Sequence, residues 1–155
     1  MKKTAIIISL LSLVSAYTFN NINLHWLRES SIELRHDETV KTADDVSYII
    51  PALQFLKTGE FKNNIAGNGS YFSRSPGYPM IFIIAGYFFD IKSTLAAVKT
   101  LQLILFTLSV YCFFFIAYSF LESEKLATIL TSIYGISNIS SGFVYYTLTE
   151  GITPA

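Results

Sequence analysis

Long stretches without charged residues alternate along this chain with polar segments. The three longest uncharged stretches are Thr4–Leu24, Thr100–Leu121 and Leu126–Thr149. Each residue of a helix adds about 1.5 Å, so about 20 residues cross the roughly 30 Å hydrocarbon core of a bilayer. The pattern therefore predicts an all-α, multi-span membrane protein whose spanning helices lie at residues 1–24, 95–121 and 126–148.

A polar segment, residues 25–75, separates the first two predicted spans and reads as an outer loop. Apolar residues recur within it at helical spacing, at Val46, Ile49, Ile50, Leu53 and Leu56. Thr42 and Asp45 have the spacing of a capping box, and Gly59 suits the end of a helix. The sequence thus predicts an amphipathic helix at residues 43–58, whose apolar face suits a membrane surface.

Prolines mark two places where regular helix is interrupted. Pro51 lies inside the predicted amphipathic helix and predicts either a kink or a break into two short helices. Residues 76–92 open on the turn-forming Pro76-Gly77-Tyr78-Pro79, which leaves Met80–Phe89 as an apolar core of about 15 Å. Because that core is too short to cross a bilayer, we expect a juxtamembrane or re-entrant segment on the outer side.

The second and third predicted spans are joined by the short link Glu122–Lys125, which predicts an antiparallel pair. The third span is rich in small residues, which allow close helix contact in lipid. They are Gly135, Ser137, Ser140, Ser141 and Gly142. Residues 149–155 start a second outer loop, and the absence of a terminal charge cluster there indicates a truncated fragment of a longer protein.

The N-terminal segment fits either a retained anchor or a cleaved signal peptide. Lys2 and Lys3 precede an apolar run, and Val14-Ser15-Ala16 offers small residues for cleavage. Uncharged sequence continues to His25-Trp26, however, where aromatic rings suit the far interface, and this favours an uncleaved span with a cytoplasmic N-terminus. Three cationic residues on the expected outer side run against that orientation, namely Arg28, Arg35 and Lys41.

Composition agrees with a membrane location, because 52% of the residues are hydrophobic and only 14% are charged. The net charge is zero and the cations are scattered, which excludes a typical nucleic-acid-binding protein. Cys112 is the only cysteine, so an intrachain disulfide is impossible. His25 and His36 have no neighbours at ligand spacing. We therefore expect no cofactor and no metal.

Four positions beside the predicted spans are candidates for chemistry. Asp44 and Asp45 can take a proton from an acceptor hydroxyl, although acidic residues also favour the first turn of any helix for dipole reasons. Arg74 precedes the proline-rich turn, where a guanidinium can hold a phosphate through paired hydrogen bonds, or can simply be a loop arginine. Glu150 can add a second acidic group, or be a helix-end charge.

These motifs, taken in order, resemble a known family. They are Asp44-Asp45-Val46-Ser47-Tyr48, Lys57-Thr58-Gly59-Glu60-Phe61 and Arg74-Ser75-Pro76-Gly77-Tyr78-Pro79. Their order and spacing are similar to the N-terminal part of polyprenyl-phosphate-sugar glycosyltransferases with the C-type membrane fold (GT-C). That group includes protein O-mannosyltransferases and aminoarabinose transferases.

The resemblance implies transfer of a sugar from a polyprenyl-phosphate donor to an acceptor hydroxyl at the outer face of a bacterial inner membrane. By that similarity Asp44, beside Asp45, is the general base, and Arg74 and Tyr78 lie near the donor phosphate. Glu150 falls where the family has a further acidic residue, usually Asp. The implied partners are the lipid-linked donor and membrane lipid, with no nucleic acid, and the isolated fragment is expected to be inactive.

Two other classes of protein remain open. The chain can belong to a non-catalytic membrane protein, such as a transporter or an assembly subunit, or it can be an inactive remnant. Transporters usually carry charged residues within their spans. The stretches Thr100–Leu121 and Leu126–Thr149 have none, which favours the transferase.

Overall fold

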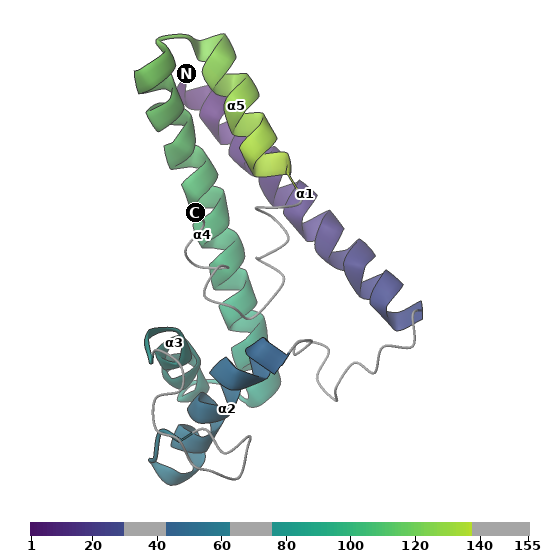
Figure 1. Ribbon diagram of the computed structural model, residues 1–155, viewed down its shortest axis with the longest axis vertical. Coiled ribbons are helices and arrows are strands. Elements are labelled where there is room, and N and C mark those ends of the chain that lie inside the picture. Colours follow the sequence, from purple (N-terminus) through teal and green to yellow (C-terminus); the bar gives the residue numbers. More distant parts are fainter. Residues whose placement is uncertain (30–42, 63–75, 138–155) are drawn as a thin grey trace. The chain divides into compact units, whose positions relative to one another are not determined.

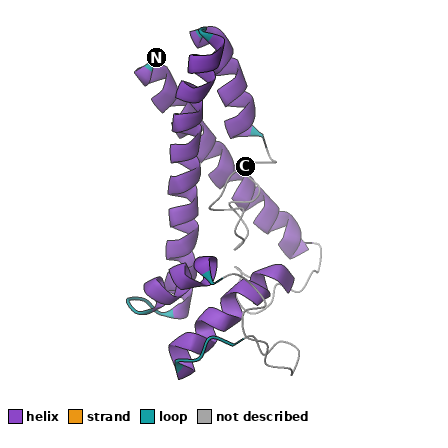
Figure 2. Ribbon diagram, turned by 60° about the vertical axis from the view of Figure 1, so that its left-hand side comes forward, coloured by secondary structure: helices purple, strands orange, loops and turns teal. Residues whose placement is uncertain are grey.

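The computed structural model describes residues 1–29, 43–62 and 76–137, and every regular element in those ranges is a helix. The helices are α1 (Lys2–Glu29), α2 (Ala43–Thr58), α3 (Gly77–Gly86), α4 (Ile91–Leu121) and α5 (Glu124–Ile136) (Figures 1 and 2). The all-α prediction is therefore confirmed for the described part of the chain.

The chain divides into two compact units. The first contains α1, the part of α4 from Leu101 onward, and α5. The second contains α2, α3 and the start of α4, up to Thr100.

Two described helices are long and apolar enough to cross a membrane, α1 over Lys2–Phe19 and α4 over Ser93–Leu121. Both coincide with stretches that the sequence marks as spans. Helix α4 begins earlier than its uncharged stretch and includes Lys92 and Lys99, because lysine is a good helix former and isolated charges do not end a helix. Helix α5 covers the start of the third predicted span. The rest of that span falls within residues 138–155, which lie outside the described part of the structure.

The first unit has an inverted distribution of side-chain size. The buried residues of α1 and α5 are mostly small, and include Ala5, Ser9, Ser12, Ala16, Ala127, Thr131 and Gly135. Large apolar residues of the same two helices point outward, among them Ile7, Leu11, Val14, Ile129 and Ile133. A water-soluble helix buries its large apolar residues instead. Small residues at helix contacts are typical of helices that associate in lipid.

Close contact between α1 and α5 depends on Gly135. A Cβ atom there would overlap the side chain of Ser12 and lie 3.1 Å from Cγ1 of Val110 on α4. The Ser12 hydroxyl donates to the Ile8 carbonyl, 2.9 Å away, so it is satisfied within its own helix. The expected packing role of the small residues is thus confirmed at Gly135.

Helix α5 turns back along α4, as the short link predicts. Glu122 adopts a φ of 50°, which ends α4, and the Ser123 side chain accepts a hydrogen bond from the backbone N–H of Leu126 to cap α5. Further along, the rings of Phe113 and Tyr134 lie 4.7 Å apart. The two helices therefore form an antiparallel pair.

The start of α1 is tied to the start of α5 through Glu124. Thr4 donates its hydroxyl to Oε1 of Glu124 at 2.7 Å, and the Met1 ammonium group lies 2.7 Å from the same oxygen. Hydrogen bonds from the N-terminal ammonium and from Thr4 lower the pKa of the Glu124 carboxyl below its ordinary value of 4.5.

This lowered pKa predicts a small, pH-dependent contribution to stability. A carboxyl whose pKa is lower in the folded state stabilises that state above its unfolded pKa, and the contribution is lost as pH falls through the folded value. We therefore expect the unfolding temperature of the protein in detergent micelles to exceed that of Glu124→Gln at pH 7. The difference should disappear well below pH 4.5. An equal difference at both pH values would contradict the ion pair.

Candidate functional site

Helices α2 and α3 carry the motifs that the sequence singles out, and they pack against each other within the second unit. Helix α2 has the bounds expected from its apolar spacing, Ala43–Thr58. The N–H of Gly59 donates to the Phe55 carbonyl at 2.8 Å, and the residue has a φ of 75°. Gly59 thus ends the helix as predicted, since glycine adopts this conformation without strain.

Helix α2 is a single helix that includes Pro51, so the predicted alternative of two short helices is wrong. Proline removes one backbone hydrogen bond, but contacts with a neighbouring helix can compensate for that loss. Pro51 and the following Ala52 are both buried.

A row of aromatic rings forms the contact between the two helices. The ring of Tyr48 meets that of Tyr78 edge to face at 5.5 Å, and Tyr78 meets Phe82 in the same way at 5.3 Å. All three side chains are buried. Such pairs add about 1 kcal/mol each beyond the burial of their area.

The two helices run in the same direction. Near their starts Tyr48 lies against Tyr78, and near their ends Leu56 lies so close to Gly86 that a Cβ on the glycine would overlap it. Eight residues separate the two contacts on either helix, about 12 Å at helical rise. The N-termini of α2 and α3, where the helix dipole is positive, therefore lie at the same end of the pair.

Of the predicted site residues, Tyr78 alone has a side chain within the described part of the structure. Asp44 and Asp45 lie in the first turn of α2, but their side chains are outside the described part of the structure. Tyr78 lies in the first turn of α3 and is only 5% exposed. Arg74 and Glu150 fall outside the described residues. Contact of Tyr78 and Arg74 with a donor phosphate stays a prediction.

Two residues of the contact were missed by sequence reasoning, Phe82 and Gly86. Phe82 follows Tyr78 by four residues, which places both rings on one face of a helix, and this spacing was the available signal. Gly86 allows close approach of Leu56, a role that depends on a neighbour that the sequence of α3 alone does not reveal.

Truncation of Tyr78 to alanine is expected to destabilise the packing of α2 on α3 by about 3 kcal/mol, because it removes a buried aromatic side chain. Hydrogen exchange of the α2 amides in micelles should accelerate by about 100-fold if the helix is released locally. The matched control is Tyr87→Ala, since Tyr87 is 69% exposed. Similar acceleration in both variants would contradict the contact.

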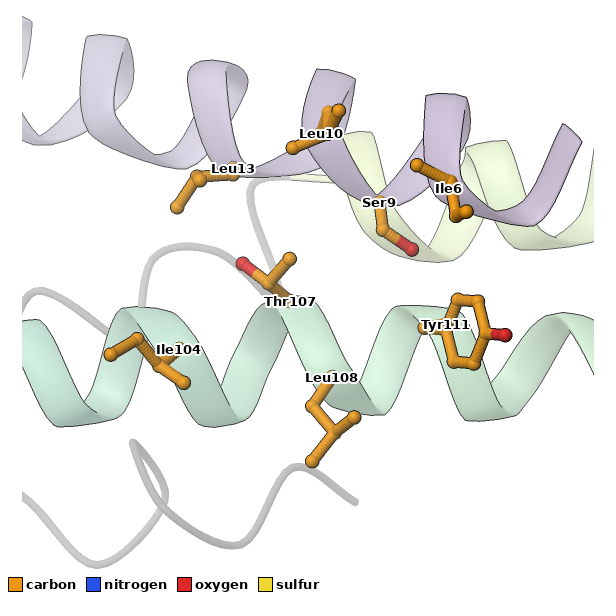
Figure 3. A pocket seen from close by; sticks show the side chains of 8 residues that line it. All are labelled: Ile6, Ser9, Leu10, Leu13, Ile104, Thr107, Leu108 and Tyr111. Atoms are coloured by element: carbon orange, nitrogen blue, oxygen red, sulfur yellow. The ribbon is translucent and has the colours of Figure 1, made fainter. Parts of the chain in front are cut away.

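An apolar groove of about 360 Å³ lies between α1 and α4 in the first unit (Figure 3). Its lining residues are Ile6, Ser9, Leu10, Leu13, Ile104, Thr107, Leu108 and Tyr111. None of these lining residues is charged. Elsewhere, the described residues hold no group of three or more His, Cys, Asp or Glu side chains that could bind a metal ion.

Comparison with known proteins adds no relative. No protein-family model matches the chain, and no curated protein or solved structure is significantly similar to it.

Proposed function

We propose that this chain is part of an integral membrane glycosyltransferase with a GT-C-like, multi-span fold. It transfers a sugar from a polyprenyl-phosphate donor to an acceptor hydroxyl at the outer face of a bacterial inner membrane, with its N-terminus in the cytoplasm. The observation that carries the proposal is the contact between Tyr48 and Tyr78, because it joins the helix that bears the acidic motif to the helix that begins in the proline-rich turn after Arg74.

The membrane part of the proposal is supported by the inverted packing of α1 and α5. Their small residues face one another while Val14 and Ile133 are each more than 60% exposed. In water, such large apolar residues would be costly to leave uncovered along two helices. In lipid they cost nothing, and the small residues permit the close contact at Gly135.

The path of the chain supports three crossings with the acidic residues outside. Helix α1 leads away from the contact between Thr4 and Glu124, and α4 leads back toward it. Two crossings complete this path, so the segment between α1 and α4 lies on one side of the membrane. With a cytoplasmic N-terminus that side is the outer one. A third span after Glu124 then brings Glu150 to the same side.

The catalytic part rests on the shared direction of α2 and α3. Asp44 precedes Tyr48 by four helical residues, about 6 Å along the axis. Arg74 precedes Tyr78 by four residues as well, so it lies within about 14 Å of it whatever the local conformation. The tyrosine contact joins the helix that bears Asp44 to the helix that follows Arg74, which supports the proposal of one site for the carboxylate and the guanidinium. Tyr78, being buried, acts here as a positioning residue.

The reaction needs a base and a positively charged place for the phosphate. Asp44 takes the proton of the acceptor hydroxyl as that oxygen forms a bond to the anomeric carbon. The bond from that carbon to the phosphate oxygen breaks, and polyprenyl phosphate leaves with the electron pair. One displacement inverts the anomeric configuration. Arg74 and the positive helix N-termini stabilise the departing phosphate, so no strong general acid is required.

A donor panel tests the proposed activity in membranes that contain the full-length protein. The panel comprises radiolabelled mannose, glucose and aminoarabinose, each linked to polyprenyl phosphate, together with the same sugars linked to nucleotides. We expect label to reach an endogenous acceptor from at least one lipid-linked donor and from none of the nucleotide sugars when synthesis of the lipid-linked form is blocked. Transfer from a nucleotide sugar, or from no donor, would contradict the proposal.

A further inference from the structure

Helix α3 is apolar on both of its faces. Its inner face, toward α2, includes the buried Tyr78, Phe82 and Ile83. The opposite, outer face includes Met80 and Ile84, four residues apart on the helix, and Tyr87 and Phe88 follow in the turn directly after Gly86. These four side chains are between 44% and 78% exposed. A helix that is apolar all round needs a covering on every side.

The sequence around α3 points to lipid as that covering. No charged residue occurs between Arg74 and Asp90, so the outer face has no polar rim of the kind that surrounds a contact between soluble proteins. The chain then continues almost directly into α4, whose apolar candidate span begins at Ser93. The side chain of Asp90 accepts a hydrogen bond from the backbone N–H of Ser93 and so caps the start of α4. The end of α3 is therefore only a few residues from hydrocarbon depth.

The length of α3 and the path of the chain determine how it meets the bilayer. Ten residues extend about 15 Å, half of the hydrocarbon core. Because α1 and α4 already complete a path that returns to the Thr4–Glu124 contact, α3 adds no crossing. Helix α3 therefore enters the bilayer from one side only. Tyr87 and Phe88 at its end are residues that suit the interface between head groups and acyl chains.

We propose that the outer face of α3 inserts among the acyl chains of one leaflet, with α2 on the side of α3 that faces away from the lipid. The helix then lies at the membrane surface and holds the N-terminal end of the α2 and α3 pair beside the lipid head groups. We rest this on the membrane location proposed above, and not on sugar transfer.

Tryptophan placement tests the insertion, because Trp26 is the only tryptophan of the chain. In a Trp26→Phe background, single variants Ile84→Trp and Phe88→Trp are reconstituted into phosphatidylcholine vesicles with or without brominated acyl chains. We expect the emission of both to be blue-shifted, mostly lost in the brominated vesicles, and little affected by aqueous iodide. Lys57→Trp, on the exposed end of α2, is the matched control and should respond to iodide instead.

A variant in α4, Ile104→Trp, separates failure of this inference from failure of the membrane location. Quenching by brominated lipid at Ile104 but not at Ile84 would leave the membrane location intact and overturn the insertion of α3. Absence of lipid quenching at both positions would overturn both. Equal lipid quenching at Ile84 and Lys57 would overturn the placement of α2 away from the lipid. Protection of Ile84 from both quenchers would show that protein covers the outer face of α3, and would overturn its insertion into lipid.

Discussion

Asparagine in place of Asp44 is expected to lower sugar transfer by at least about 100-fold, since a positioned general base contributes about that much or more. The substitution preserves the shape of the side chain and removes its ability to take a proton. A purely structural role at the start of α2 predicts little change, because the helix dipole is worth only about 0.3 to 1 kcal/mol to an acidic residue there. The assay is initial-rate transfer from the active lipid-linked donor.

The control for this variant is Glu122→Gln, which neutralises an exposed carboxylate in the link between α4 and α5. It should transfer at the rate of the unmodified protein, and both variants should reach the membrane in equal amounts. Asp45→Asn tests the neighbouring carboxylate, and its loss should be smaller if Asp44 is the base. A fully active Asp44→Asn protein would refute the assignment.

Leucine in place of Gly135 is expected to separate α1 from α5 and to destabilise the first unit by about 3 kcal/mol or more, at the upper end of the cost of overpacking. The added side chain would occupy the position of the Ser12 side chain and press on Val110. Neither neighbour can move far, because Ser12 and Val110 are fully buried between helices. Thermal unfolding in micelles should show a fall of several degrees in the midpoint.

Ile136→Leu is the matched control for this second variant, because Ile136 is adjacent in sequence and 46% exposed. Its unfolding midpoint should be unchanged. Hydrogen exchange should be faster in α1 of the Gly135→Leu protein and normal in α2, which belongs to the other unit. An unchanged midpoint for Gly135→Leu would show that α1 and α5 do not meet at this glycine.

Much of the helical pattern can be predicted from sequence because it depends on local signals. The apolar spacing between Val46 and Leu56 and the glycine at position 59 define α2 to the residue. The effect of Pro51 was harder to predict, because the packing of the neighbouring residues decides whether a helix continues through a proline. The early start of α4, before Lys99, shows that the absence of charge marks hydrophobic depth better than it marks a helix boundary.

The candidate site is less accessible from sequence, because it depends on which helices meet. The residue types at Asp44 and Arg74 indicate chemistry, but nothing local shows that Tyr48 and Tyr78 touch or that α2 and α3 run the same way. The buried face of α1 consists mainly of small residues, among them Ala5, Ser12 and Ala16, and no sequence pattern predicted it. Gly135, which packs against this face at Ser12, lies more than a hundred residues away in sequence. Their contact is therefore seen only in the folded structure.

In the proposed topology the acidic start of α2 and position 150 share the outer aqueous side, while the link between α4 and α5 lies on the other side. Single cysteines in a Cys112→Ser background, at Asp45→Cys, Glu150→Cys and Glu122→Cys, can be treated with a membrane-impermeant maleimide on intact cells. We predict labelling of positions 45 and 150 from outside, and labelling of position 122 only after permeabilisation. Labelling of 45 from outside with 150 reached only from inside, or of 122 together with 45, would contradict the account.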